Sequence, residues 1–139
     1  MRVLVDTNVV VDVLLNREEH VAAAQQVLSL ARHGAIQVIL CATTITTIDY
    51  LVVKALGAPA SSRTVKSLLS DYEIATVDAG ALGRALELGF AEYEDAVLHA
   101  AGEAAGAEAI VTRDRDGFRR ATLPVLSPAE LVNLVRSER

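Results

Sequence analysis

Aspartates stand at three places in the chain where strand ends and helix starts could bring them together. Asp6 follows the first apolar run, Asp95 opens an alanine-rich stretch, and Asp114 and Asp116 follow Ala109–Val111. Carboxylates that lie close together repel one another, and a divalent cation relieves that repulsion. Oxygen ligands suit Mg²⁺ or Mn²⁺, and two such ions can activate water for phosphodiester hydrolysis. The acids therefore predict a metal-dependent hydrolytic site.

The elements that must position these acids are short apolar runs that alternate with amphipathic stretches. Apolar runs predict strands at Arg2–Val5, Gln37–Cys41, Ile74–Val77, Ala109–Val111 and Pro124–Leu126. Helical spacing also predicts a series of helices. The first begins near Val9, and the next two cover Glu18–Arg32 and Thr43–Leu56. The later ones start after Ser61 or Ser62, run from Asp78 to about Leu88, cover Asp95–Ala105 and start after Ser127. This alternation predicts a single α/β domain over residues 1–139, with a mostly parallel sheet of about four to five strands covered by helices on both faces.

The stretch Thr43–Leu56 fits two structures. Its threonines and valines favour a strand, whereas Ile45, Ile48 and Leu51 recur at helical spacing. Its length and the Gly57–Pro59 stop signal favour a helix, which we expect.

The acids are expected to converge on one rim of the sheet. Ligand sites of open α/β sheets lie beyond the carboxyl ends of the strands, where Asp6, Asp114 and Asp116 fall. Asp95 lies in the first turn of its helix, where the helix dipole favours an ionised carboxylate. Purely structural roles are the alternatives: Asp6 and Asp95 could serve a helix start, and the other two could form a turn before Gly117.

Composition excludes several classes of protein. The chain is 52% apolar with 4% aromatic residues, but no apolar run approaches the roughly 18 residues of a membrane span. The first residues are too short for a signal-peptide core, so we expect a cytoplasmic protein without a membrane partner. The single cysteine, Cys41, cannot form an internal disulfide. The net charge of −5 argues only weakly against nucleic acid, because bound cations would offset clustered acids.

Three segments together resemble the PIN-domain family, most closely its VapC-like toxin ribonucleases. Val3-Leu4-Val5-Asp6-Thr7-Asn8-Val9-Val10 is similar to the family's opening strand and first acid. Glu92-Tyr93-Glu94-Asp95-Ala96 resembles its third-acid segment, and Ile110-Val111-Thr112-Arg113-Asp114-Arg115-Asp116-Gly117-Phe118 resembles its closing motif. Each motif alone is weak, but their order and spacing agree over nearly the whole chain.

The resemblance implies a PIN-like α/β/α sandwich and a Mg²⁺- or Mn²⁺-dependent endoribonuclease, the toxin of a type II toxin–antitoxin pair. It implies metal ligation by Asp6, Asp95 and Asp114, with Asp116 as a further candidate. The implied partners are an RNA substrate and a small antitoxin, in a homodimer or a higher assembly with the antitoxin. A non-catalytic PIN-like module that binds RNA or protein is the alternative. An aspartate phosphatase ranks last, because Asn8 stands where its second acid would be.

The family's usual glutamate in the helix after the second strand is absent. The resemblance puts Thr47 at its position, and Asp49, the only acid on this helix, lies about 200° further round the helix axis. Either Thr47 contributes a hydroxyl or water contact, or a shifted ligand set uses Asp49 as a catalytic acid.

Polar residues beside the acids are candidates for supporting roles. Thr7, Asn8, Thr47 and Thr112 could orient carboxylates or position water, and could equally serve as caps and turn formers. The basic side chains around the last acids could contact RNA phosphates or form a solvated basic stretch, and the candidates for contact are Arg113, Arg115 and Arg119. His99 shares a helix face with Asp95, and we interpret it as a packed or surface residue.

Overall fold

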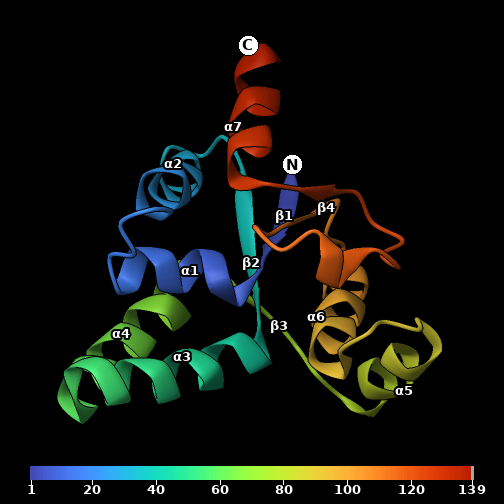
Figure 1. Ribbon diagram of the computed structural model, residues 1–139, viewed down its shortest axis with the longest axis horizontal. Helices are drawn as coiled ribbons and strands as arrows, with labels where there is room; N and C mark the ends of the chain where they lie inside the picture. The colour runs from blue at the N-terminus through green and yellow to red at the C-terminus, as the bar shows by residue number, and fades with distance from the viewer. Residues whose placement is uncertain (139) are drawn as a thin grey trace.

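A parallel five-stranded sheet forms the centre of the protein, as a computed structural model that describes residues 1–138 shows (Figure 1). The strand order is β3-β2-β1-β4-β5, and every neighbouring pair is parallel. The strands are β1 Arg2–Val5, β2 Gln37–Cys41, β3 Glu73–Ala75, β4 Ala109–Val111 and β5 Val125–Leu126. The predicted α/β fold with a parallel sheet of four to five strands is confirmed.

The strands form because their apolar side chains are buried on both faces of the sheet. In the central strand β1, Val3, Leu4 and Val5 are all fully buried. Val3 and Val5 belong to the larger core cluster and Leu4 to the cluster on the other face, as the alternation of side chains along a strand requires.

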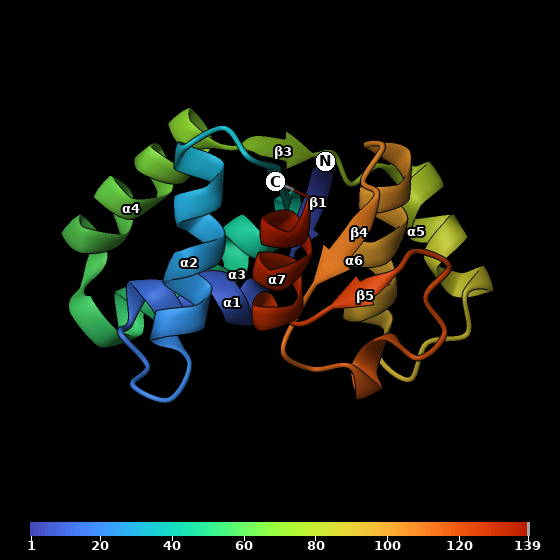
Figure 2. The same cartoon turned by 90° about the horizontal axis from the view of Figure 1, so that it is seen from above.

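Helices cover both faces, and Figure 2 shows the two groups on either side of the sheet. The helices are α1 Thr7–Leu14, α2 Val21–Arg32, α3 Ala42–Leu56, α4 Ala58–Asp71, α5 Ala79–Glu87, α6 Tyr93–Ala104 and α7 Pro128–Ser137, and a short 3₁₀ helix, η1, spans Asp116–Phe118. Residues of α1, α2, α3 and α7 join the larger core cluster, while α6 packs on the opposite face and α5 packs on α6. Among residues 1–138, no helix is long and apolar enough to cross a membrane.

A glycine sets how closely α6 approaches the sheet. A Cβ atom at Gly102 would lie 2.8 Å from Leu4 Cδ2, a distance that real Cβ atoms do not show. The lack of a side chain lets α6 lie directly on β1, and this contact fixes the helix whose first turn carries Asp95.

Several helix starts differ from the prediction. The stretch at Thr43–Leu56 is helical, as expected, but the next helix begins at Ala58 and not after Ser61 or Ser62. Proline is tolerated in a first turn, where its missing N–H would have no partner, so Pro59 lies inside α4. Likewise α2 begins at Val21 instead of Glu18, and α6 begins two residues before Asp95.

Asp78 and Ser127 cap the helices that the sequence predicts to start at these residues. The Asp78 side chain accepts a hydrogen bond from the Ala81 N–H at the start of α5. Ser127 and Glu130 form a reciprocal capping box at the start of α7. These local signals could be read from the sequence because capping needs only residues three positions apart.

Candidate metal-binding site

The carboxyl ends of β1 and β4 bring the first and last acid segments side by side. Val5 pairs with Val111, and the Asp6 N–H donates to the Val111 carbonyl over 2.9 Å. Asp6 and Thr112 are therefore neighbours, although they are more than one hundred residues apart in the chain.

Asp6 is buried and held by neutral donors. Its Oδ1 accepts from the Thr7 N–H at 2.8 Å, and its Oδ2 accepts from the Thr112 hydroxyl at 2.8 Å. Only 7% of the residue is exposed, and burial raises the pKa of Asp6 above its ordinary value although both hydrogen bonds oppose the rise. Among the described residues, no basic side chain forms an ion pair with this carboxylate.

The Thr112 hydroxyl links the acid segments to each other. Besides donating to Asp6, its oxygen accepts from the Asp114 N–H at 3.0 Å and from Asn8 Nδ2 at 3.4 Å. Thr112 is fully buried. The geometry fits the predicted role of Thr112 in orienting carboxylates.

Asp95 and Asp114 meet above Gly117. A Cβ atom at Gly117 would lie 2.9 Å from Asp95 Oδ2 and 3.0 Å from Asp114 Oδ2. The Gly117 N–H also donates to Asp114 Oδ1 at 3.2 Å. Because glycine leaves this space free, two carboxylate oxygens approach one small volume.

Asp95 lies among other negatively charged side chains. Burial, followed by the negative charges of Asp6, Glu92, Asp114 and Glu94, raises the pKa of Asp95 to about 7. A carboxyl group at this pKa gives up its proton more readily when a cation is near.

These acids share one pocket of about 290 Å³. Its lining includes the three predicted ligands together with Glu92 and Glu94, and the full set is Asp6, Thr7, Asn8, Val11, Arg17, Leu51, Glu92, Glu94, Asp95, Leu98 and Asp114. A larger cavity of about 600 Å³ lies near the amino ends of the strands, where Arg2, Gln37 and Glu73 line it, and it holds none of the predicted ligands.

The donor set fits a hard divalent cation. Carboxylate oxygens from three separate segments face one pocket, and the space beside Gly117 lies between two of them. Within residues 1–138, no three His, Cys, Asp or Glu side chains are already close enough to hold an ion among them. Mutual repulsion keeps unneutralised carboxylates apart, so a bound cation would require small side-chain movements.

Helix α3 contributes no acid to the pocket lining among the described residues. Thr44 is buried, with its hydroxyl 2.8 Å from that of Thr7, and Leu51 lines the pocket. Thr47 lies on α3 between these two and about 60° from Thr44 around the axis, whereas Asp49 lies about 140° away.

Asp49 is directed toward the neighbouring helix. It is exposed, and its Oδ1 accepts from the Ser61 hydroxyl at 2.6 Å. The structure therefore does not bring Asp49 to the acid pocket, because the helical period turns it toward α4. Thr47 lies nearer than Asp49 to the helix face that carries Thr44 and Leu51, but it does not line the pocket either.

Asp116 also lies outside the pocket. Its side chain is 85% exposed and accepts from Arg119 Nη2 at 3.2 Å. It begins η1, where the chain turns away from the strand end. The structure separates it from the other acids, although only Arg115 lies between it and Asp114 in the chain.

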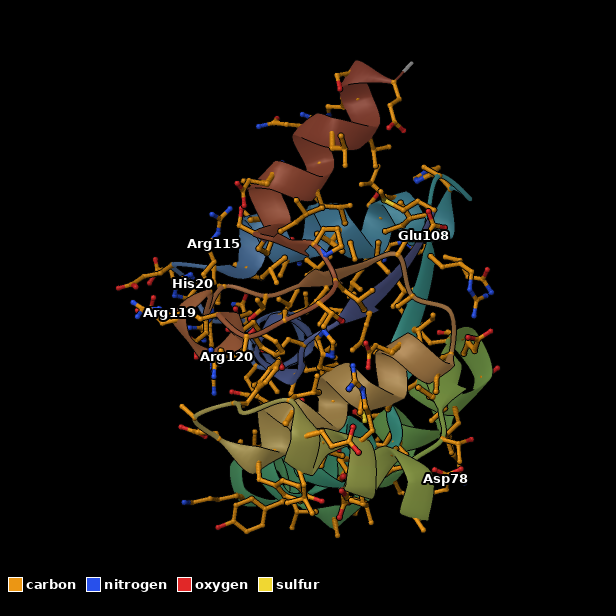
Figure 3. The ribbon with its side chains drawn as sticks, turned by 90° about the vertical axis from the view of Figure 1, so that its right-hand side faces the viewer. His20, Asp78, Glu108, Arg115, Arg119 and Arg120 are labelled. Atoms are coloured by element: carbon orange, nitrogen blue, oxygen red, sulfur yellow. The ribbon has the colours of Figure 1, made fainter. Side chains whose placement is uncertain are left out.

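The three arginines predicted to contact RNA all have carboxylate partners. Arg113 Nε and Nη2 donate to the two oxygens of Asp12, at 2.7 Å and 3.2 Å. Arg115 pairs with Glu130, and Arg119 pairs with Asp116. Figure 3 shows Arg115 and Arg119 together on one side of the molecule. Among the described residues that line the acid pocket, none is one of these three.

Asn8 and His99 each leave one buried polar atom without a hydrogen-bond partner within residues 1–138, namely Asn8 Oδ1 and His99 Nδ1. Asn8 lines the acid pocket. His99 is fully buried, and its Nε2 accepts from the Thr122 N–H at 3.0 Å. Its packed role agrees with the interpretation from sequence.

Sequence reasoning missed Asp12, Arg17 and Gly117. Asp12 sits between apolar residues on α1, and a charge inside an apolar stripe signals a buried pair. Arg17 and Gly117 gave no such signal, because their contacts depend on how distant segments pack.

Comparisons with known proteins identify the family of this chain. A family model described as "PIN domain" matches residues 2–116, so the chain belongs to the PIN domain family. None of the curated proteins matches the sequence.

Solved structures with the same fold include toxin–antitoxin complexes. VapBC2 from Rickettsia felis bound to a promoter DNA fragment superposes with a TM-score of 0.71 and 18% identity, covering 91% of this chain and 98% of that one. A toxin–antitoxin complex from Klebsiella pneumoniae superposes with a TM-score of 0.70 and 23% identity, covering 91% of this chain and 97% of that one. DNA-bound VapBC from Salmonella typhimurium superposes with a TM-score of 0.70 and 16% identity, covering 92% of this chain and 98% of that one. At these identities the likeness establishes the fold.

Proposed function

We propose that this protein is a metal-dependent endoribonuclease and the toxin of a type II toxin–antitoxin pair. The observation that carries the proposal is the convergence of Asp6, Asp95 and Asp114 on one pocket, with oxygens of the last two beside Gly117. Membership of the PIN domain family supports a nuclease, and the fold shared with VapBC complexes supports the pairing with an antitoxin.

The three aspartates would hold Mg²⁺ or Mn²⁺. When bound, the cation supplies Lewis acidity toward water and the phosphate oxygens. The Asp6 carboxylate keeps its orientation through Thr7 and Thr112, and Asp114 is fixed through its own N–H and that of Gly117. Hydrolysis adds water to phosphorus and breaks one P–O bond, with the proton passing to the departing oxygen.

A non-catalytic PIN-like module is the second candidate. Its support is that α3 contributes no acid to the pocket lining among the described residues, only Leu51. The two candidates differ in one measurable property, which is metal-dependent turnover.

The test is cleavage of labelled single-stranded RNA by purified protein with Mg²⁺, with Mn²⁺ and with a chelator. We expect cleavage with either metal and none with the chelator, Asp6→Asn or Asp95→Asn. Asp116→Asn is the matched control, because its carboxylate lies outside the pocket. Cleavage that persists in the first two variants, or binding without metal-dependent cleavage, contradicts the proposal.

The antitoxin, the assembly and the cytoplasmic location belong to the same proposal. Expression of the chain alone should arrest growth, and Asp6→Asn should relieve the arrest.

Exposed apolar side chains on α3 and α4, namely Tyr50, Val53, Leu56 and Leu69, offer contact area for a second copy or an antitoxin. Light scattering of the purified chain measures whether it forms the expected homodimer.

A further inference from the structure

Arg17 occupies an unusual place at the acid pocket. Among residues 1–138 it is the only basic side chain in the pocket lining, which otherwise contains five acids. Its side chain is 41% exposed, so solvent reaches part of it. A phosphate group entering such an acidic pocket needs a cation beside it to offset repulsion.

The backbone fixes where Arg17 lies. Helix α1 ends in a Schellman motif, in which the Asn16 N–H donates to the Val13 carbonyl at 3.2 Å and the Arg17 N–H donates to the Asp12 carbonyl at 2.9 Å. Asn16 has the left-handed conformation, with φ of 50°, that this motif requires. Arg17 is therefore held at the end of α1 and is not part of a freely moving loop.

The side chain of Asp12 aligns Arg17 without neutralising it fully. Asp12 is 1% exposed, and both of its oxygens accept from Arg113. Arg17 Nη1 lies 3.6 Å from Asp12 Oδ1, beyond hydrogen-bond distance. Because a guanidinium carries five N–H donors and this contact is too long to be a hydrogen bond, Arg17 keeps donors for another anion.

We infer that Arg17 binds a phosphate of the RNA strand at the mouth of the acid pocket, held there by Asp12 and the Schellman turn. This inference rests on the proposed ribonuclease function, and it assigns the phosphate contact to Arg17 because Arg17 lines the pocket, whereas Arg113, which donates through Nε and Nη2 to Asp12, does not. A guanidinium binds phosphate through paired hydrogen bonds, which an ammonium group cannot reproduce.

The experiment compares Arg17→Gln, Arg17→Lys and Arg63→Gln with the wild-type protein. Arg63 is an exposed arginine on α4 that does not line the pocket, so its variant controls for the loss of one positive charge. Steady-state cleavage of labelled single-stranded RNA gives KM and kcat. Fluorescence anisotropy on an Asp6→Asn background, which prevents cleavage, gives the salt dependence of RNA binding.

Arg17→Gln should raise KM at least about tenfold, because a hydrogen-bonded charge contact is lost. The slope of log affinity against log salt should fall by about 0.7, the contribution of one phosphate contact on a single strand. Arg17→Lys should restore the slope but only part of KM, and Arg63→Gln should leave KM unchanged. The melting temperature of each variant is measured in parallel.

The outcomes separate this inference from the proposed function. If the wild type cleaves RNA while Arg17→Gln keeps its KM and salt slope, the inference is overturned and the ribonuclease stands. If the wild type binds RNA without cleaving it, the anisotropy slope still decides the role of Arg17. A wild type that does not bind RNA overturns both.

Discussion

Asp6 and Asp12 are two nearly buried carboxylates less than two helical turns apart, and they have opposite electrostatic surroundings. Asp12 is paired with Arg113 and faces Arg17, whereas Asp6 has only neutral donors and lies near Asp114 and Glu94. Removing one partner of a buried ion pair destabilises the fold, because the other charge is left unpaired. A buried charge among other acids costs stability, and such a site gains most from a bound cation.

The strongest test of this contrast is the activity of Asp6→Asn. We expect RNA cleavage to fall about a thousandfold, or about 4 kcal/mol in the activation barrier, because the substitution removes one ionic ligand. The metal-free protein should stay as stable or become more stable, since charge repulsion is relieved. Cleavage rates and thermal melts of the same preparation measure both. An Asp6→Asn protein that unfolds would instead identify Asp6 as a structural cap.

Asp12→Asn should have the opposite profile. Removing this charge leaves Arg113 without its partner, and the free energy of unfolding should fall by about 3 kcal/mol, somewhat less than for a wholly buried pair because Arg113 is partly exposed. Urea unfolding measures the change. Asp116→Asn, which breaks the exposed pair with Arg119, should cost less than about 0.5 kcal/mol. Equal losses in the two variants would remove the distinction between buried and exposed pairs.

Metal should stabilise the acid pocket specifically. At about 100 times Kd, Mg²⁺ or Mn²⁺ should add about 2.7 kcal/mol to the stability of the wild type, seen as a higher melting temperature. The metal-induced increase in melting temperature should be much smaller in Asp95→Asn and unchanged in Asp116→Asn. A similar rise in all three proteins would indicate metal binding elsewhere on the chain.

The stability of the metal-free protein should also depend on pH. Because the pKa of Asp95 is raised from 3.8 to about 7, its protonated form favours the fold. This contribution is complete below the unfolded pKa and is lost as pH rises through about 7. Asp95→Asn should therefore melt close to the wild type near pH 4 and above it near pH 8. A difference that does not grow with pH would contradict the raised pKa.

Local sequence signals determined most of the fold. The apolar runs gave all five strands, and the caps at Asp78 and Ser127 gave two helix starts, because these features depend on residues close in sequence. Pro59 misled the prediction of α4, since a proline can belong to a first turn as readily as it can end a helix.

The sequence alone also placed Asp6, Asp95 and Asp114 as candidate ligands, because strand ends and helix starts of a parallel sheet share one rim. Only the tertiary structure decided which other residues reach that rim. The helical period turned Asp49 toward Ser61, and η1 carried Asp116 into solvent. Packing of α1 against the β4 end paired Arg113 with Asp12 and left Arg17 at the pocket, a result that depends on contacts about one hundred residues apart.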